Sequence, residues 1–311
     1  MQQEFSPLDG AYVVTGPTSG IGLCAAMELS RHGPVILVGR NGDRLDAVSG
    51  RIAEQGGRAT PVVCDIADPV SVRRAVAKIL ALDCRICGLL NNAGIMSTQA
   101  ARNVTGWDLS FATNHLGPFL LTESLLPKIP DGAQVLFVVS ALEDPQRAPA
   151  RVMGMRGGRF ISVEAAVRGE WLEGGSRIPG IDAYATAKQC ALAATLALAR
   201  EHPRLRINAV EPGINPDTGL GGGNAAMRFV MSQIITRLPP FRQFRSTPDR
   251  AGRVIASILV SPSARSGIYF DEKGLPMRGS SLVHDPIFQD RVLGETRAFL
   301  GRHVLPDGSV A

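Results

Sequence analysis

The chain has 311 residues, of which 45% are hydrophobic and 20% charged, and its formal net charge is +5. These values are typical of an ordinary globular protein, and no basic block interleaved with aromatic residues indicates nucleic-acid binding. No apolar run reaches the ~18 residues of a membrane span. The first ten residues lack the basic and apolar regions of a secretion signal, so we expect a cytoplasmic protein.

Metal and hydrolase chemistry have no support in this sequence. The five cysteines are an odd number, which fits a reducing compartment better than a disulfide framework. Cys84 and Cys87 have CxxC spacing, but no second pair or nearby histidine completes a metal site, so we expect small buried thiols, with a redox role as the alternative. The histidines are scattered and no GxSxG motif is present. We predict no metal site.

Short apolar runs alternate with segments of helical spacing through the first two-thirds of the chain. This alternation predicts an α/β fold, in which residues 1–311 form a single doubly wound Rossmann domain with a mostly parallel seven-stranded sheet. The predicted strands are Ala11–Val14, Val35–Val38, Pro61–Cys64, Gly88–Leu90, Val135–Val139, Ile207–Val210 and Gly267–Phe270. The predicted helices are Ile21–Arg31, Arg44–Glu54, Pro69–Leu82, Gly106–Leu126, Ala183–Arg200 and Pro248–Val260.

Two long stretches interrupt the alternation, an insert at residues 141–183 and a stretch rich in Gly and Pro at residues 215–244. Each follows the carboxyl end of a strand, where open α/β sheets bind ligands. Long connections at such positions are more often functional than decorative. We therefore predict that residues 215–244 form a substrate lid, and the role of the insert stays open.

A glycine-rich turn follows the first strand, in AYVVTGPTSGIG. Gly16 permits a tight turn, and Gly20 and Gly22 allow the helix terminus to approach a pyrophosphate without a Cβ in the way. Because the turn follows the first strand and opens the first helix, it predicts a dinucleotide site.

The end of the second strand, in ILVGRNGDR, indicates which dinucleotide binds. An acidic residue usually meets a free ribose 2′-hydroxyl here, whereas this chain has Arg40, with Arg44 one turn further. A guanidinium can grip a 2′-phosphate, so we expect NADP rather than NAD. Asp65, just past the third strand, can accept from the adenine amino group. The small residues of Asn91–Gly94, NNAG, allow the cofactor close to the backbone.

Five motifs in chain order resemble the short-chain dehydrogenase/reductase family. They are TGxxxGIG at Thr15–Gly22, NNAG at Asn91–Gly94, Ser140 at the end of the fifth strand, YxxxK at Tyr184–Lys188, and Pro212-Gly213 after the sixth strand. The motifs and the resemblance together give these cofactor-contacting residues: Gly16, Thr18, Ser19, Gly20, Ile21, Gly22, Arg40, Asp65, Ile66, Asn92, Ala93, Gly94, Tyr184, Lys188, Pro212 and Gly213.

Finer matches resemble the retinol dehydrogenase and protochlorophyllide reductase branch of that family. They are TNHLGPFLLT at Thr113–Thr122, GRNGDRLDA, the long insert, and SGIYF near the end. Three features depart from the family pattern. Cys87 stands where Asp is common, the insert is longer than expected, and Thr218 comes one residue late after Pro212-Gly213. The contact of Thr218 with the cofactor therefore stays open.

Tyr184 and Lys188 are spaced i and i+4, so they share one face of a helix. An ammonium near the phenol favours phenolate, and a positive nicotinamide ring adds to this effect. We expect Tyr184 to be the general acid in ketone reduction or the base in alcohol oxidation, with Ser140 hydrogen-bonded to the substrate oxygen. The resemblance assigns Asn114 to a water-linked proton path through Lys188, and Lys188 also to the ribose hydroxyls.

The substrate is indicated only by side chains in the two long stretches. Their apolar residues either wall a substrate pocket or, as we favour, pack the stretches against the body. The arginines of the insert either meet an anionic substrate or a membrane surface or, as we favour, form a solvated face. The apolar set is Phe160, Ile161, Val163, Trp171, Leu172, Leu238, Phe241 and Phe244, and the basic set is Arg147, Arg151, Arg156 and Arg159.

The leading hypothesis is an NADP-dependent oxidoreductase that acts on a carbonyl or alcohol of a lipophilic small molecule, the substrate class being an analogy with the branch. The alternatives are a carbon–carbon double-bond reductase of the same fold and a non-catalytic NADP-sensing protein. The helix Ala183–Arg200 is apolar almost all round, which predicts a core helix. In the resembled family this helix often also forms a homodimer face, so the oligomeric state stays open.

Overall fold

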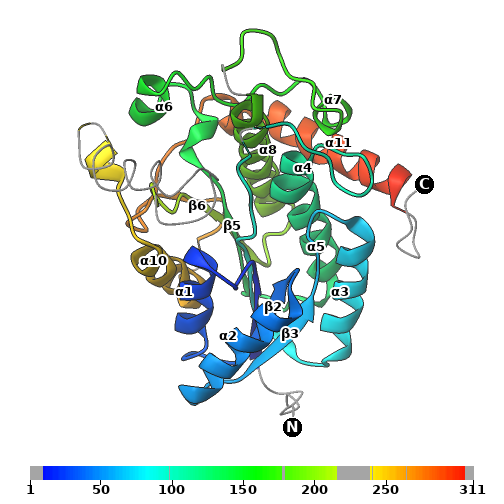
Figure 1. The fold of residues 1–311 in the computed structure, drawn as a ribbon, viewed down its shortest axis with the longest axis vertical. Helices are drawn as coiled ribbons and strands as arrows, with labels where there is room; N and C mark the ends of the chain where they lie inside the picture. Colours follow the sequence, from blue (N-terminus) through cyan, green and yellow to red (C-terminus); the bar gives the residue numbers. More distant parts are fainter. Residues whose placement is uncertain are drawn as a thin grey trace.

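The computed structural model describes residues 10–97, 99–176, 179–215, 239, 241–263 and 265–304. Its strands form one sheet in the order β3-β2-β1-β4-β5-β6-β7, and each neighbouring pair is parallel (Figure 1). The strands are β1 Gly10–Thr15, β2 Val35–Gly39, β3 Ala59–Val63, β4 Arg85–Asn91, β5 Gln134–Val138, β6 Arg206–Val210 and β7 Tyr269–Phe270. The predicted doubly wound fold is confirmed, and its strand order reverses between β1 and β4.

Helices cover both faces of the sheet (Figure 1). On one face α1 Gly20–Leu29, α2 Gly42–Glu54 and α10 Pro248–Val260 share a core with the strands. On the other face lie α3 Pro69–Ala81, α5 Gly117–Leu125 and α8 Pro179–Glu201. Local sequence sets the starts of several helices, since Asn41, Asp68 and Thr247 each accept a first-turn backbone N–H. Among the described residues, no helix combines the length and apolarity of a membrane crossing.

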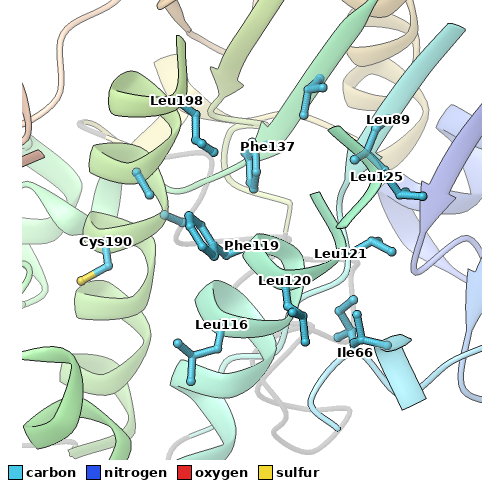
Figure 2. Close-up of a cluster of buried hydrophobic side chains, with 14 of the residues drawn as sticks. Ile66, Leu89, Leu116, Phe119, Leu120, Leu121, Leu125, Phe137, Cys190 and Leu198 are labelled. Atoms are coloured by element: carbon cyan, nitrogen blue, oxygen red, sulfur yellow. The ribbon is translucent and has the colours of Figure 1, made fainter. Parts of the chain in front are cut away.

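The largest core cluster fills the space between the sheet, α5 and α8 (Figure 2). Leu121 and Leu125 of α5 are fully buried, as are Leu89 of β4 and Leu198 of α8. Figure 2 shows Phe119 and Phe137 between these two helices. Each such side chain contributes about 1.5–3 kcal/mol through burial, so this cluster fixes α8 against the sheet.

The prediction of one regular helix at Gly106–Leu126 is wrong, because the helix starts later and is irregular. The helix begins with α4 Leu109–Phe111, continues as a π-helical segment, η1 Ala112–Leu116, and then as α5. Gly106 has φ +82°, a left-handed conformation that cannot belong to the helix. Asp108 instead caps the helix by accepting the N–H of Phe111 at 2.8 Å.

The insert contains two short helices, α6 Ala148–Val152 and α7 Val163–Val167, and α8 begins at Pro179, four residues before the predicted start. Phe160 and Val163 are buried, and the Phe160 ring lies 5.6 Å from that of Phe288. The packing interpretation is therefore confirmed for these two side chains. Ile161 and Leu172 are partly exposed at 38% and 52%.

The arginines of the insert do not form one surface. Arg151 and Arg156 are exposed, as a solvated face requires. Arg159 instead donates to the Leu172 carbonyl, and the Arg147 guanidinium lies 4.5 Å from the centre of the Phe244 ring. Most of the predicted lid at 215–244, including Thr218 and Leu238, lies outside the described residues.

The sequence reading missed the helix α11 Pro286–His303. Asp285 caps this helix, and Pro286 occupies its first turn. In Figure 1 α11 lies beside α8 and α7, and its side chains Val292, Leu293 and Phe299 belong to the same core cluster as α8. The chain itself therefore covers α8.

A buried carboxylate joins the start of the insert to the segment before α11. Glu143 is fully buried in the 3-10 helix η3 Ala141–Glu143 and accepts the Ser280 backbone N–H at 2.8 Å and the Ser280 hydroxyl at 2.6 Å. Burial raises the pKa of Glu143 to about 7, although the Ser280 and Gln189 hydrogen bonds lower it; the neighbouring Asp144 raises it further. The folded protein therefore binds a proton near neutral pH that the unfolded chain releases.

We expect this carboxylate to make the protein less stable as the pH rises from about 5 to 8. The folded pKa is above the unfolded value, so its contribution is fully present below the unfolded pKa and is lost as the pH rises through 7. Glu143 should account for a fall of about 2–3 kcal/mol in the free energy of unfolding. Urea unfolding at a series of pH values measures this fall, and Glu143→Gln should make the free energy of unfolding less dependent on pH. The control Glu54→Gln, at an exposed site, should keep the wild-type slope. An equal slope in Glu143→Gln would contradict the assignment.

Candidate active site

A cavity of about 350 Å³ opens at the carboxyl edge of the sheet. Its walls include Thr15 of β1, Gly39 of β2, Asn92 after β4 and Val138 of β5. Every predicted cofactor-contacting residue lines it apart from Gly213. Gly213 instead makes a turn at φ +77° that packs closely against residues near the lid segment.

The glycine turn after β1 is held against the NNAG segment after β4. The Asn92 side chain donates to the Thr15 carbonyl at 2.9 Å and to the Gly16 carbonyl at 3.3 Å. Gly16 has φ +68°, and a Cβ on Gly22 would lie 2.2 Å from the Gly16 oxygen and 2.3 Å from Asn92 Nδ2. Gly22 is thus required by contacts within the protein, in addition to the ligand approach that the sequence predicted.

Arg40 lies at the end of β2, is exposed, and lines the cavity. Arg44 does not line it; its backbone N–H donates to Asn41 Oδ1 at the start of α2. Asp65 Oδ1 accepts the Ala67 N–H at 3.0 Å, so one carboxylate oxygen serves a local turn at the cavity wall. The geometry therefore distinguishes the two arginines, since Arg40 lines the cavity and Arg44 does not.

The structure brings Ser140, Tyr184 and Lys188 together. Tyr184 and Lys188 line the cavity but are each only 4% exposed. Lys188 Nζ donates to the Val138 carbonyl at 2.7 Å and lies 5.7 Å from the Tyr184 ring centre. The Ser140 hydroxyl, two residues after β5, lies close enough to the Tyr184 phenol to lower its pKa. Tyr184 and Lys188 thus lie at the cavity wall, whereas Ser140 lies beside Tyr184 and does not itself line the cavity.

Burial, not the lysine, dominates the protonation of Tyr184. Burial raises the pKa of the Tyr184 phenol well above its ordinary value, the Ser140 hydrogen bond lowers it, and the Glu211 carboxylate raises it. Burial also lowers the pKa of Lys188 to about 8, and Glu211 opposes that change. The protein groups by themselves therefore do not produce the expected lowering of the Tyr184 pKa, because burial disfavours the charged phenolate.

Asn114 adjoins this group from the π-helical segment η1, a type of helix irregularity that is frequent at functional sites. Its amide nitrogen donates to the Ile95 carbonyl at 2.8 Å, and its oxygen accepts the Ile95 N–H at 3.2 Å. A Cβ on Gly94 would lie 2.7 Å from Asn114 Oδ1 and 3.5 Å from Lys188 Nζ. Asn114 is thus a neighbour of Lys188, buried behind the cavity wall.

Comparisons with known proteins agree with this geometry. A sequence model of the short chain dehydrogenase family matches residues 11–149. Human retinol dehydrogenase 13 is 36% identical over 120 residues, which are 38% of this chain and 36% of that protein. A crystal structure of an uncharacterised Mycobacterium paratuberculosis protein is 25% identical, covers 94% of both chains and has a TM-score of 0.69.

A short chain dehydrogenase from Shigella flexneri, solved in complex with NADP, is 25% identical with a TM-score of 0.59, and the match covers 86% of this chain and 98% of that one. The chain is therefore similar to the short-chain dehydrogenase/reductase family, whose sequence model matches its first part. Its relatives include retinol dehydrogenase 13 and dehydrogenase/reductase SDR family member 13. The matched segments span only 34% to 43% of the length of three curated relatives.

One buried residue beside the family motifs was missed by the sequence reading. Glu211 directly precedes Pro212-Gly213, is 8% exposed, and its carboxylate accepts the backbone N–H of Ala141, the residue after Ser140. A signal was present in the sequence, since an acidic residue directly follows β6, at the edge of the sheet where open α/β folds bind ligands.

Replacing Gly22 with alanine should destabilise the fold by about 1–3 kcal/mol, because the added Cβ overlaps the Gly16 carbonyl and the Asn92 amide. The matched control is Gly50→Ala in α2, where a Cβ meets nothing within 4 Å. That change should stabilise the protein by about 0.5–1 kcal/mol. Urea unfolding measures both, and a Gly22→Ala variant as stable as the control would show that the turn does not need this glycine.

Proposed function

We propose that this protein is a member of the short-chain dehydrogenase/reductase family and an NADP(H)-dependent oxidoreductase that interconverts a carbonyl and an alcohol on a small lipophilic molecule. One observation carries the proposal: Tyr184 and Lys188, with Ser140 next to Tyr184, share a cavity with the Gly16 turn and Arg40. A nucleotide-binding turn and a proton donor in one cavity are the two parts that hydride transfer to a carbonyl requires.

The residues present fit a phosphorylated dinucleotide. Gly16 and Gly20 have positive φ values at the start of α1, which opens the helix terminus to a pyrophosphate. Arg40 would hold the 2′-phosphate, Asp65 would receive the adenine, and Lys188 would meet the ribose hydroxyls. When bound, the nicotinamide supplies or accepts the hydride. The NADP complex of the Shigella flexneri relative supports NADP over NAD.

Tyr184 donates its hydroxyl proton to the carbonyl oxygen as that oxygen gains negative charge. The Ser140 hydroxyl orients the same oxygen and stabilises the developing charge. Because burial raises the pKa of Tyr184, the phenol stays protonated at neutral pH, which is the form that a general acid needs.

The lipophilic substrate class is supported by the retinol dehydrogenase-like relatives. Phe160 and Val163 of the insert do not contribute to a substrate pocket, because they pack against the body of the protein. Phe241 is also buried, which leaves Phe244, beside Arg147, as an aromatic residue near the site.

Tyr184→Phe should lower kcat/KM for carbonyl reduction by about 10²–10⁴ while the NADPH dissociation constant stays nearly unchanged, because only the proton donor is removed. The matched control is Tyr12→Phe, the same chemical change on β1 outside the cavity lining, which should leave turnover intact. The assay is a panel of ketones, aldehydes and alcohols with NADPH, NADP and NAD.

Three results would count against the proposed function. Full turnover in Tyr184→Phe would remove the tyrosine mechanism. NADPH binding with no turnover of any carbonyl would favour a sensing protein. Product analysis that finds a reduced carbon–carbon double bond would replace carbonyl reduction.

Arg40→Ala should raise the KM for NADPH by roughly ten- to a hundred-fold and leave that for NADH almost unchanged, because a charge-assisted hydrogen bond to the 2′-phosphate is lost. Arg44→Ala is the control, since Arg44 does not line the cavity. Initial-rate kinetics with both coenzymes give the comparison. An equal rise in the two constants would refute the phosphate contact.

A further inference from the structure

Glu211 lies between the backbone segment that follows Ser140 and β7, the edge strand of the sheet. It follows β6, and its backbone N–H donates to the Phe270 carbonyl of β7 at 2.8 Å. The residue is 8% exposed, although a carboxylate in an apolar environment is costly unless it is paired. The structure pairs it in two ways, by hydrogen bonds and by charge.

The hydrogen bonds connect Glu211 to the two backbone segments that border the active site. Its carboxylate accepts the N–H of Ala141, which opens η3 immediately after Ser140. The Gly213 backbone N–H, in the turn after β6, also lowers the pKa of this carboxylate. The Ser140 hydroxyl in turn lies beside the Tyr184 phenol. A displacement of the carboxylate would therefore move the segment that carries Ser140.

The charges around Glu211 come from four parts of the chain. Burial raises its pKa to about 7; Arg147, from the insert, lowers it, and Glu272, two residues after β7, raises it. From α8 it faces Tyr184 and Lys188, and its carboxylate raises the pKa of both. The Tyr269 hydroxyl of β7, which is buried without a hydrogen-bond partner, also feels this carboxylate.

We propose that Glu211 is a positioning residue that fixes the Ser140 segment and, through its negative charge, sets the pH range in which the Tyr184–Lys188 pair holds its protons. The inference rests on the proposed function, in which Tyr184 is the proton donor. Two strongly interacting groups lose protons as a pair, and a nearby negative charge shifts that loss to higher pH. Glu211 thereby keeps the buried pair protonated under conditions in which burial alone would leave Lys188 neutral.

Glu211→Gln tests the charge, because the glutamine oxygen can still accept the Ala141 N–H. The alkaline limb of kcat/KM for carbonyl reduction should move to lower pH by about one unit, while kcat below this limb stays near the wild-type value. Glu211→Ala removes the acceptor as well and should lower kcat below the limb roughly ten-fold. The matched control is Glu272→Gln, a buried acid whose loss lowers the pKa of Glu211 and should not move the limb down.

A second readout needs no turnover. The NADPH dissociation constant, measured by calorimetry across pH, should rise as Lys188 loses its proton, and in Glu211→Gln this rise should occur about one pH unit lower. Unchanged pH profiles of rate and binding in Glu211→Gln would overturn the inference, even if kcat falls. Equal downward shifts in Glu211→Gln and Glu272→Gln would overturn it too.

The proposed function is judged separately, on wild-type protein and Tyr184→Phe. Wild-type protein that turns over no carbonyl, or Tyr184→Phe that keeps full activity, refutes the function itself. If the wild type reduces a carbonyl and Glu211→Gln leaves the pH profiles of rate and NADPH binding unchanged, only the role of Glu211 is refuted.

Discussion

The burial of an ammonium group is the constraint on which the active site depends. Lys188 is 4% exposed, and an unpaired cation there would cost several kcal/mol. The Val138 carbonyl accepts one of its protons at 2.7 Å, and the Glu211 carboxylate supplies opposite charge. Both partners come from the carboxyl ends of adjacent parallel strands, β5 and β6. The ends of these two strands therefore both stabilise the buried charge of Lys188 and fix its position.

The helix that carries Tyr184 and Lys188 is held by more than the sheet. Residues 180–199 of α8 are all buried within the chain, because α5 packs on one side and α11 on another. The packing of this one chain thus fixes the helix that carries Tyr184 and Lys188 against the sheet.

The sequence predicted the framework well because its signals are local. Continuous apolar runs identified all seven strands, and the glycine turn and YxxxK identified the two ends of the cavity. The sign of the Tyr184 pKa shift could not be predicted, because it depends on burial and on Glu211, which lies 27 positions away in the sequence. The sequence did not predict the π-helical turn at Asn114 or the packing of α11 for the same reason, because each depends on packing between distant segments. The predictions failed where chemistry depends on tertiary surroundings.

Two buried carboxylates act on the short helix η3, which follows Ser140. Glu211 binds its first backbone N–H, and Glu143, its last residue, is tied to Ser280. Burial raises the pKa of each to about 7, so both change charge in the same pH range. Of the two, Glu211 has Tyr184 and Lys188 as electrostatic neighbours, whereas Glu143 faces the insert, Gln189 and the segment before α11. A change of pH near 7 therefore acts at both ends of η3. The charge of Glu143 affects the stability of the insert, and the charge of Glu211 affects the protonation of Tyr184 and Lys188.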